Sequence, residues 1–81
     1  MFIVYAISSE NRPYIYVGLT SDLGQRLHRH NAGLEKTTRP YRPFQLLYTE
    51  ECNSRSQARA RERYWKSGIG KEQLRALRDG R

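Results

Sequence analysis

Two short runs of β-branched and aromatic residues lie close together at the start of the chain. They occupy residues 2–7 and 14–18, and a polar stretch that ends in Pro13 separates them. Such runs favour β-strands, and a polar connection of this length is typical of a β-hairpin. Because side chains alternate along a strand, Tyr16 and Val17 should face opposite sides of the sheet. The chain is therefore expected to begin with two paired strands.

The spacing of apolar residues becomes helical after residue 20. Asp22 is a suitable N-cap, and Gly33 is a suitable stop for the helix that follows. The residues from 35 to 43 form a basic, hydroxyl-rich loop that contains two prolines, and residues 44–49 read as a third strand. The first helix carries one stripe at i, i+3, i+4 and i+7, which consists of Leu23, Arg26, Leu27 and His30.

Two further helices are expected after the third strand. Ser54 and Gln57 have the spacing of a capping box, so a long helix should begin there and reach Lys66. Glycines just after Lys66 are expected to end it, and a short last helix occupies residues 72–78. The order β-β-α-β-α-α predicts a single α+β domain over residues 1–81, with a small three-stranded, mainly antiparallel sheet flanked by helices.

The charge of the chain favours a polyanionic partner. Its formal net charge is +7, and twelve arginines accompany only three lysines. Arginine pairs with phosphate at two points and stacks on bases, so this bias favours nucleic acid over a membrane surface. A basic protein without such a partner is the alternative reading of the same charge.

Length and cysteine content restrict the kind of site and its surroundings. A chain of 81 residues has little room for an enclosed cavity, so an active site is expected in a surface cleft. Cys52 is the only cysteine, which excludes an internal disulfide and fits the reducing cytoplasm. No stretch approaches the ~18 apolar residues that a membrane span needs.

One carboxylate interrupts the inward stripe of the second long helix. That stripe contains Ala58, Glu62, Trp65 and Ile69. A carboxylate that faces the body of a domain is costly unless it is paired or binds a metal, so Glu62 is a candidate ligand for Mg²⁺ or Mn²⁺. An ordinary helix ion pair with Lys66 explains the same pattern, and periodicity does not decide between the two.

Four other side chains could join this carboxylate in a site. Arg26 and His30 lie four residues apart on the first helix, so both could meet one phosphate. Taken singly, Arg26 is more often a solvated residue and His30 a packed one. Tyr5 and Tyr16 lie on neighbouring strands, where tyrosines usually serve in packing.

Taken together, these residues resemble a known family. In order along the chain, the matching positions are Val4-Tyr5-Ala6, Tyr16-Val17-Gly18 with Thr20, Asp22-Leu23, Arg26-Leu27, His30-Asn31, Arg42-Pro43, Tyr48, Ala58, Arg61-Glu62 and Lys66-Ser67-Gly68. This pattern resembles the GIY-YIG nuclease superfamily over almost the whole chain. It is most similar to stand-alone bacterial endonuclease-like proteins, which are themselves similar to the N-terminal nuclease domain of the excision-repair incision subunit.

The resemblance implies a divalent-metal-dependent phosphodiesterase that cuts DNA. Glu62 would be the only protein carboxylate on one metal ion, and Arg26 would stabilise the transition state. Tyr5 and Tyr16 would line the site, and one of them would either deprotonate or only orient the attacking water, because an ordinary tyrosine pKa is about 10. His30 would assist proton transfer or bind phosphate. The nucleic-acid backbone would be gripped by Lys36, Thr38, Arg39 and Arg42.

Two other functions fit the same sequence. A catalytically weak or inactive module could keep the fold and the basic surface and only bind nucleic acid. A ribosome- or RNA-associated accessory protein would have the same charge. An exposed groove could work in a monomer or in a weak homodimer.

Overall fold

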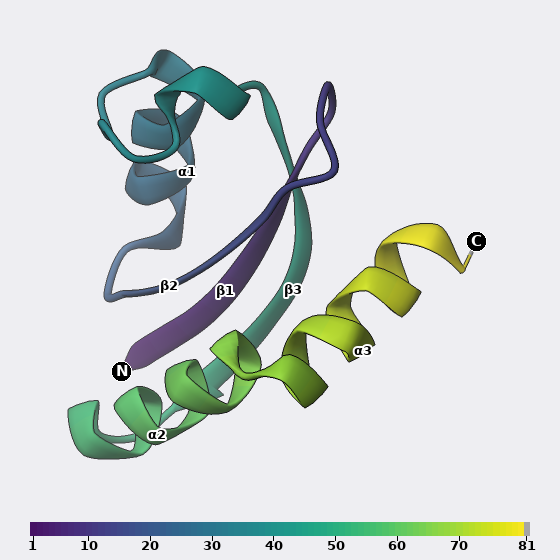
Figure 1. Cartoon of the computed structure of the whole chain (residues 1–81). Helices are drawn as coiled ribbons and strands as arrows, with labels where there is room; N and C mark the ends of the chain where they lie inside the picture. The colour runs from purple at the N-terminus through teal and green to yellow at the C-terminus, as the bar shows by residue number, and fades with distance from the viewer. Residues whose placement is uncertain (81) are drawn as a thin grey trace.

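A three-stranded antiparallel sheet forms the centre of the protein in the computed structural model, which describes residues 1–80 (Figure 1). The strands are β1 (Phe2–Ser9), β2 (Ile15–Thr20) and β3 (Phe44–Cys52), in the spatial order β2-β1-β3. Both neighbours of β1 pair with it in antiparallel fashion, so the predicted sheet is confirmed. β3 continues three residues beyond the expected end at Thr49, because Phe2 of β1 still pairs with Cys52.

Helices cover both faces of this sheet. α1 (Leu23–Ala32) and the short 3-10 helix η1 (Arg39–Tyr41) lie on one face, and α2 (Arg55–Lys66) and α3 (Gly68–Asp79) lie on the other. The predicted element order is confirmed, with η1 added inside the basic loop. None of the helices within residues 1–80 is long and apolar enough to cross a membrane.

Alternation along β1 divides the interior into two apolar clusters. The even-numbered Val4 and Ala6 pack under α2 and α3 with Ala58 and Leu74. The odd-numbered side chains of β1 point to the α1 face. That second cluster contains Tyr5, Ile7 and Phe44, with Tyr16, Leu23, Leu27 and Tyr41 packed against it.

Side-chain caps fix where the predicted helices begin and end. Asp22 accepts a hydrogen bond from the backbone N–H of Gln25 at 3.1 Å, and Gly33 ends α1 with a left-handed φ of 78°. Ser54 likewise accepts from the N–H of Gln57 at 3.1 Å. These three predicted boundaries are confirmed.

The junction between α2 and α3 differs from the prediction. Gly68 and Gly70 do not end a helix; they lie in the first turn of α3, and Ser67 caps both helices. Gly70 is required because a Cβ there would lie 2.2 Å from the carbonyl oxygen of Tyr64. The break at Ser67 also turns Ile69 outward, with 65% of its surface exposed, so Ile69 does not belong to the inward stripe of α2.

Candidate active site

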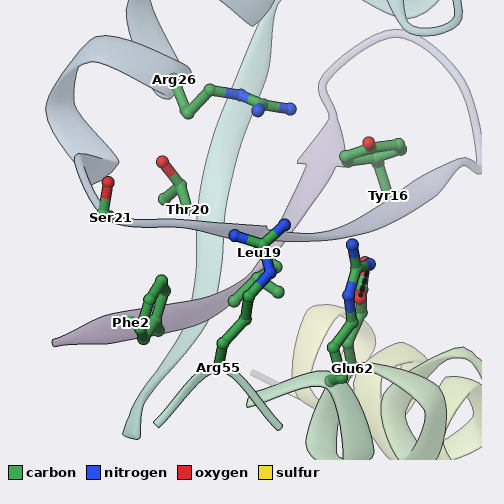
Figure 2. A pocket seen from close by; sticks show the side chains of 9 residues that line it. Phe2, Tyr16, Leu19, Thr20, Ser21, Arg26, Arg55 and Glu62 are labelled. Carbon is green, nitrogen blue, oxygen red and sulfur yellow. Dashed lines mark hydrogen bonds and ion pairs between the residues drawn. The ribbon is translucent and has the colours of Figure 1, made fainter. Parts of the chain in front are cut away.

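A cleft of about 420 Å³ opens where the carboxyl end of β2, the start of α1 and one side of α2 meet (Figure 2). Three of the predicted catalytic residues, Tyr16, Arg26 and Glu62, line it together although they come from three different elements. The remaining lining residues are Phe2, Leu19, Thr20, Ser21, Arg55 and Arg59. One carboxylate and three guanidinium groups therefore surround the space.

Glu62 lies on the boundary between two stripes of α2. Ala58 and Trp65 on one side of it pack into the core, whereas Arg59 and Lys66 on the other side are exposed. The carboxylate is 10% exposed and accepts one contact per oxygen, from Arg59 Nη1 at 3.1 Å and from Lys66 Nζ at 3.2 Å. The inward carboxylate and the helix ion pair, which the sequence presented as alternatives, are both present in the structure.

Arg26 and Tyr16 form the opposite wall of the cleft. Figure 2 shows the Arg26 guanidinium reaching across the cleft from α1, and the Tyr16 ring standing on β2. Arg26 Nε is buried and has no hydrogen-bond partner within residues 1–80; the Glu35 carboxylate is 3.8 Å away. A buried N–H without a partner is unusual, because its desolvation is not compensated. Because the Arg26 side chain also lines the cleft, it is positioned to bind an anion there.

Tyr5 does not line the cleft, contrary to the expectation for the two signature tyrosines. It is fully buried, and its ring lies over Gly18, where an added Cβ would come within 2.5 Å of the phenol oxygen. Burial raises the pKa of the Tyr5 phenol well above its ordinary value, although the nearby Arg26 cation opposes this. Tyr5 therefore stays a neutral phenol, and its ring lies 6.2 Å, centre to centre, from that of Tyr16.

A chain of hydrogen bonds continues from Tyr5 into α1 and the following loop. The Thr38 hydroxyl oxygen lies 2.8 Å from His30 Nδ1, and the Tyr5 hydroxyl oxygen lies 2.8 Å from His30 Nε2, so the imidazole ring joins the two hydroxyl groups. Burial lowers the pKa of His30, and the Arg26 cation lowers it further, so the ring is neutral at pH 7. We call Tyr5, His30 and Thr38 the buried relay.

This burial changes the position of two predicted site residues. Neither His30 nor Thr38 exposes any surface, so neither side chain can touch a phosphate in this structure. The expectation that His30 binds phosphate and that Thr38 grips the nucleic-acid backbone does not fit their burial. The position of Thr38 differs from the prediction, because a residue that grips the nucleic-acid backbone must be exposed. The Thr38 hydroxyl instead lies in the interior, where it completes the relay.

Lys36, Arg39 and Arg42 are exposed, as expected, but do not line the cleft. Arg39 Nε donates to the carbonyl oxygen of Gly33 at 2.8 Å, and Arg42 Nη1 donates to that of Ala32 at 3.3 Å. Cations at these carbonyls are favourable because they meet the negative end of the α1 dipole. Since ten residues of helix span about 15 Å, the guanidinium groups of Arg39 and Arg42 lie roughly that far from the end of α1 that borders the cleft.

Arg55 and Arg59 also line the cleft, although the sequence did not single them out. Arg55, Arg59, Glu62 and Lys66 recur at i, i+4, i+7 and i+11, so they share one stripe of α2. Attention to the apolar stripe placed Glu62 among core residues and overlooked this basic stripe beside it. Thr20 and Ser21 join the cleft because the turn that caps α1 passes along its rim.

The donor set fits a metal ion that substrate helps to hold, and does not fit a preformed cage. Within residues 1–80, no three His, Cys, Asp or Glu side chains are grouped as metal ligands. Glu62 is the only carboxylate on the cleft wall, and its ion-pair partners Arg59 and Lys66 are each 51% exposed, so they can move aside. Mg²⁺ is often held by one carboxylate together with water and phosphate oxygens.

Comparison with known proteins gives one consistent result. Residues 1–74 match the sequence profile of the GIY-YIG catalytic domain. A UPF0213 protein of Pediococcus acidilactici is 40% identical over 68 residues, which cover 80% of this chain and 69% of that protein. A UPF0213 protein of Halobacterium salinarum is 42% identical over 60 residues, which cover 73% of this chain and 77% of that protein.

The extent of the match varies among these relatives. A UPF0213 protein of Desulfotalea psychrophila is 38% identical over 50 residues, and the match spans only 46% of that protein. A solved structure also matches: the solution NMR structure of a UPF0213 protein from Bacillus halodurans has a TM-score of 0.56 and 33% identity, and the alignment covers 99% of this chain and 88% of that one. The UPF0213 name itself states no reaction.

Proposed function

Because the chain belongs to the GIY-YIG family of catalytic domains, and within it resembles the UPF0213 proteins, we propose that it is a metal-dependent endonuclease that hydrolyses phosphodiester bonds in DNA. One observation carries the proposal: Tyr16, Arg26 and Glu62 line a single cleft although they lie on a strand and two helices. Tyr16 can orient a water molecule, Arg26 supplies a cation for the phosphate, and Glu62 supplies an oxygen ligand for a metal ion.

Arg26 and Tyr16 act on the reacting phosphate. The Arg26 guanidinium would pair with the phosphate oxygens and stabilise the charge that they gain in the transition state. The Tyr16 phenol can donate to and accept from a water molecule, so it would orient the water that attacks phosphorus. In-line attack then forms a new P–O bond as the water gives up a proton to solvent, and it breaks the bond to the leaving oxygen, which takes up a proton from solvent.

Tyr5 and His30 support these groups from behind. A neutral, fully buried phenol is a poor base, so its pKa argues that Tyr5 positions Tyr16 and Arg26 and does not deprotonate water. His30 holds the Tyr5 hydroxyl at 2.8 Å and is in turn held by Thr38. Both residues are therefore assigned a positioning role.

Glu62 is the residue that would hold the divalent metal ion, Mg²⁺ or Mn²⁺. When bound, such an ion would supply Lewis-acid stabilisation to the phosphoryl oxygens. Phosphates that enter the cleft would attract Arg59 and Lys66, which would free the carboxylate for this task. Since one chain forms the whole cleft, we expect a monomer or a weak homodimer to be sufficient.

The test is cleavage of branched, nicked, single-stranded and duplex DNA, with Mg²⁺ or Mn²⁺ and with chelator. We expect cleavage that needs metal and that Glu62→Ala lowers by at least about a thousandfold, which corresponds to about 4 kcal/mol of barrier. Glu72→Ala removes an exposed carboxylate on α3 and serves as the matched control. Equal cleavage by Glu62→Ala, or cleavage in chelator, would contradict the proposal.

The alternative is a nucleic-acid-binding module of the same fold with little or no turnover, acting on DNA or RNA. The ion pairs at both oxygens of Glu62 favour it, because they already satisfy the carboxylate without a metal. Structured RNA belongs in the same assay for this reason. Metal-independent binding of DNA or RNA, with no cleavage of either, would establish the alternative.

A further inference from the structure

A second group of cations lies beside β2, away from the cleft. On α3, Lys71, Arg75 and Arg78 follow the spacing i, i+4, i+7 and therefore share one face of the helix. None of them lines the candidate active site. They border a hollow of about 170 Å³, which we call the α3 groove and which is lined by Pro13, Tyr14, Ile15, Lys71, Arg75 and Arg78.

The α3 groove concentrates positive charge. Lys71 Nζ is fixed at the groove wall because it donates to the carbonyl oxygen of Ile15 at 2.7 Å. Burial lowers the pKa of Lys71, and the neighbouring cations Arg75 and Lys66 lower it further. Arg78 is paired with Asp79 at 2.8 Å, so three groove cations and one carboxylate leave two positive charges. A bound anion would relieve the repulsion among these cations.

The position of the groove relative to the cleft suggests what the anion is. β2 is an edge strand of the sheet, and both features lie along it. Ile15 at its amino end lines the groove, and Thr20 at its carboxyl end lines the cleft. Tyr16, which lines the cleft, directly follows Ile15, so the groove and the cleft are neighbours at this edge of the sheet, and a duplex bound in the cleft can place its flanking phosphates at the groove.

We propose that the α3 groove is a second DNA-binding site, which holds the phosphate backbone of a duplex beside the bond that is cut in the cleft. This inference rests on the proposed function, because it takes the scissile bond to lie beside Tyr16 and Glu62. Lys71 and Arg75 would contact phosphate, and the rigid β2 edge would set the distance between the two contacts. The domain would therefore require duplex on one particular side of the cut.

The experiment measures affinity for a series of duplexes that are shortened from either side of the cut. We expect a step in affinity, on one side of the cut only, when the duplex becomes long enough to reach the groove. Arg75→Gln should remove that step: at about 0.15 M salt the affinity for long duplex should fall roughly fivefold, and the log-log salt slope should become about 0.9 smaller, as expected for one lost phosphate contact.

Arg63→Gln is the matched control, because Arg63 is an exposed arginine on α2 that lines neither the cleft nor the groove. It should leave the step in place. Lys71→Gln combined with Arg75→Gln should give about twice the reduction in the log-log salt slope. Because Lys71 also donates a hydrogen bond to β2, thermal melting should be used to check that this double variant is folded. The inference would be overturned if Arg75→Gln lost the same affinity for short and for long duplexes, or if Arg63→Gln lost as much affinity as Arg75→Gln.

Binding without metal, in a Glu62→Ala background, separates this inference from the proposed function. If the wild-type protein cuts no nucleic acid, but the step in affinity is present and disappears in Arg75→Gln, the second binding site is supported and the catalytic proposal is refuted. If the protein cuts DNA but shows no step in affinity, only the second binding site is refuted. A step on duplex RNA but not on duplex DNA, or an effect of Arg75→Gln on anionic vesicles only, would also overturn the assignment.

Discussion

The buried relay and the wall of the cleft use polar groups in opposite ways. The relay joins Tyr5, His30 and Thr38 by neutral hydrogen bonds, and none of the three side chains is accessible to solvent. In the cleft wall, Glu62 is joined to two basic side chains that are each about half exposed. The relay has no freedom to exchange partners, whereas the carboxylate can change its partners without disturbing the core.

The difference shows that residues of one family signature can have different roles, which here are internal support in the relay and contact with ligands in the cleft. A buried polar group that loses its partner costs about 1–3 kcal/mol, whereas an exposed helix ion pair contributes about 0.3–0.5 kcal/mol. Substitutions in the relay should therefore lower stability and activity together. Substitutions in the cleft wall should change binding or chemistry while stability stays nearly constant.

Gly18→Ala should have the largest effect on stability, because it strikes the relay directly. The added methyl group would lie 2.5 Å from the Tyr5 phenol oxygen, so the ring must shift and its bond to His30 must stretch. Overpacking of this kind costs up to about 3 kcal/mol, and each kcal/mol lowers the melting temperature of a domain of this size by about 4–8 °C. Gly24→Ala is the control, since its new Cβ meets nothing closer than 3.9 Å. Equal melting temperatures for both variants would contradict the role of Gly18.

Thr38→Val should have a smaller effect of the same kind. Valine keeps the shape of threonine but cannot form the hydrogen bond with His30 Nδ1, which leaves a buried ring nitrogen unpaired at a cost of about 1–2 kcal/mol. Urea denaturation measures the loss, and the exposed Thr37→Val is a neighbouring control. Cleavage by Thr38→Val should fall as well, because Tyr5 is no longer held in one orientation. Full activity with reduced stability would show that the relay is only structural.

The relay should also make stability depend on pH. The pKa of His30 is lower in the folded protein than its ordinary value of about 6.5, so the unfolded chain binds more protons below that pH. Stability is therefore fully present above about pH 6.5 and is lost as the pH falls toward the folded pKa. Unfolding free energies at pH 5, 6 and 7 measure this. His30→Gln should weaken the dependence, and His28→Gln, at an exposed position, should leave it unchanged.

Arg59→Gln should have the smallest effect on stability, and it tests whether Glu62 in the cleft wall can change its partners. Loss of its ion pair with Glu62 should change the unfolding free energy by no more than about 0.5 kcal/mol. The carboxylate then keeps only Lys66, so Mn²⁺ titration of the free protein should give tighter binding. Arg63→Gln should not change it. Unaltered Mn²⁺ affinity in Arg59→Gln would mean that the pair does not compete with metal.

The sequence predicted most of the fold because local signals and packing agree there. The hairpin, the caps at Asp22 and Ser54 and the stop at Gly33 each act over a few residues, and each is present as expected. The α2–α3 boundary could not be predicted in this way. Glycine after a helix ordinarily signals its end, but here Gly70 serves a close approach between two helices, which is a tertiary contact.

Three of the five predicted catalytic residues lie in one cleft, whereas Tyr5 and His30 are buried. Tyr16, Arg26 and Glu62 come together in the cleft, and spacing along the chain had placed each on the correct element. The burial of Tyr5 could not be read from alternation alone, because it depends on the missing side chain of Gly18 on the neighbouring strand. The interior position of Thr38 depends on a partner eight residues away, across a loop whose path no local rule specifies.

Ser67 ends one helix and starts the next, so no flexible segment separates the helix that carries Glu62 from the helix that carries Arg75. The position of Arg75 relative to Glu62 is then set by the helical backbone on both sides of Ser67. One residue inserted at this junction would rotate α3 by about 100° relative to α2. The cations of α3 would then turn away from Ile15, while the residues that line the cleft would keep their positions.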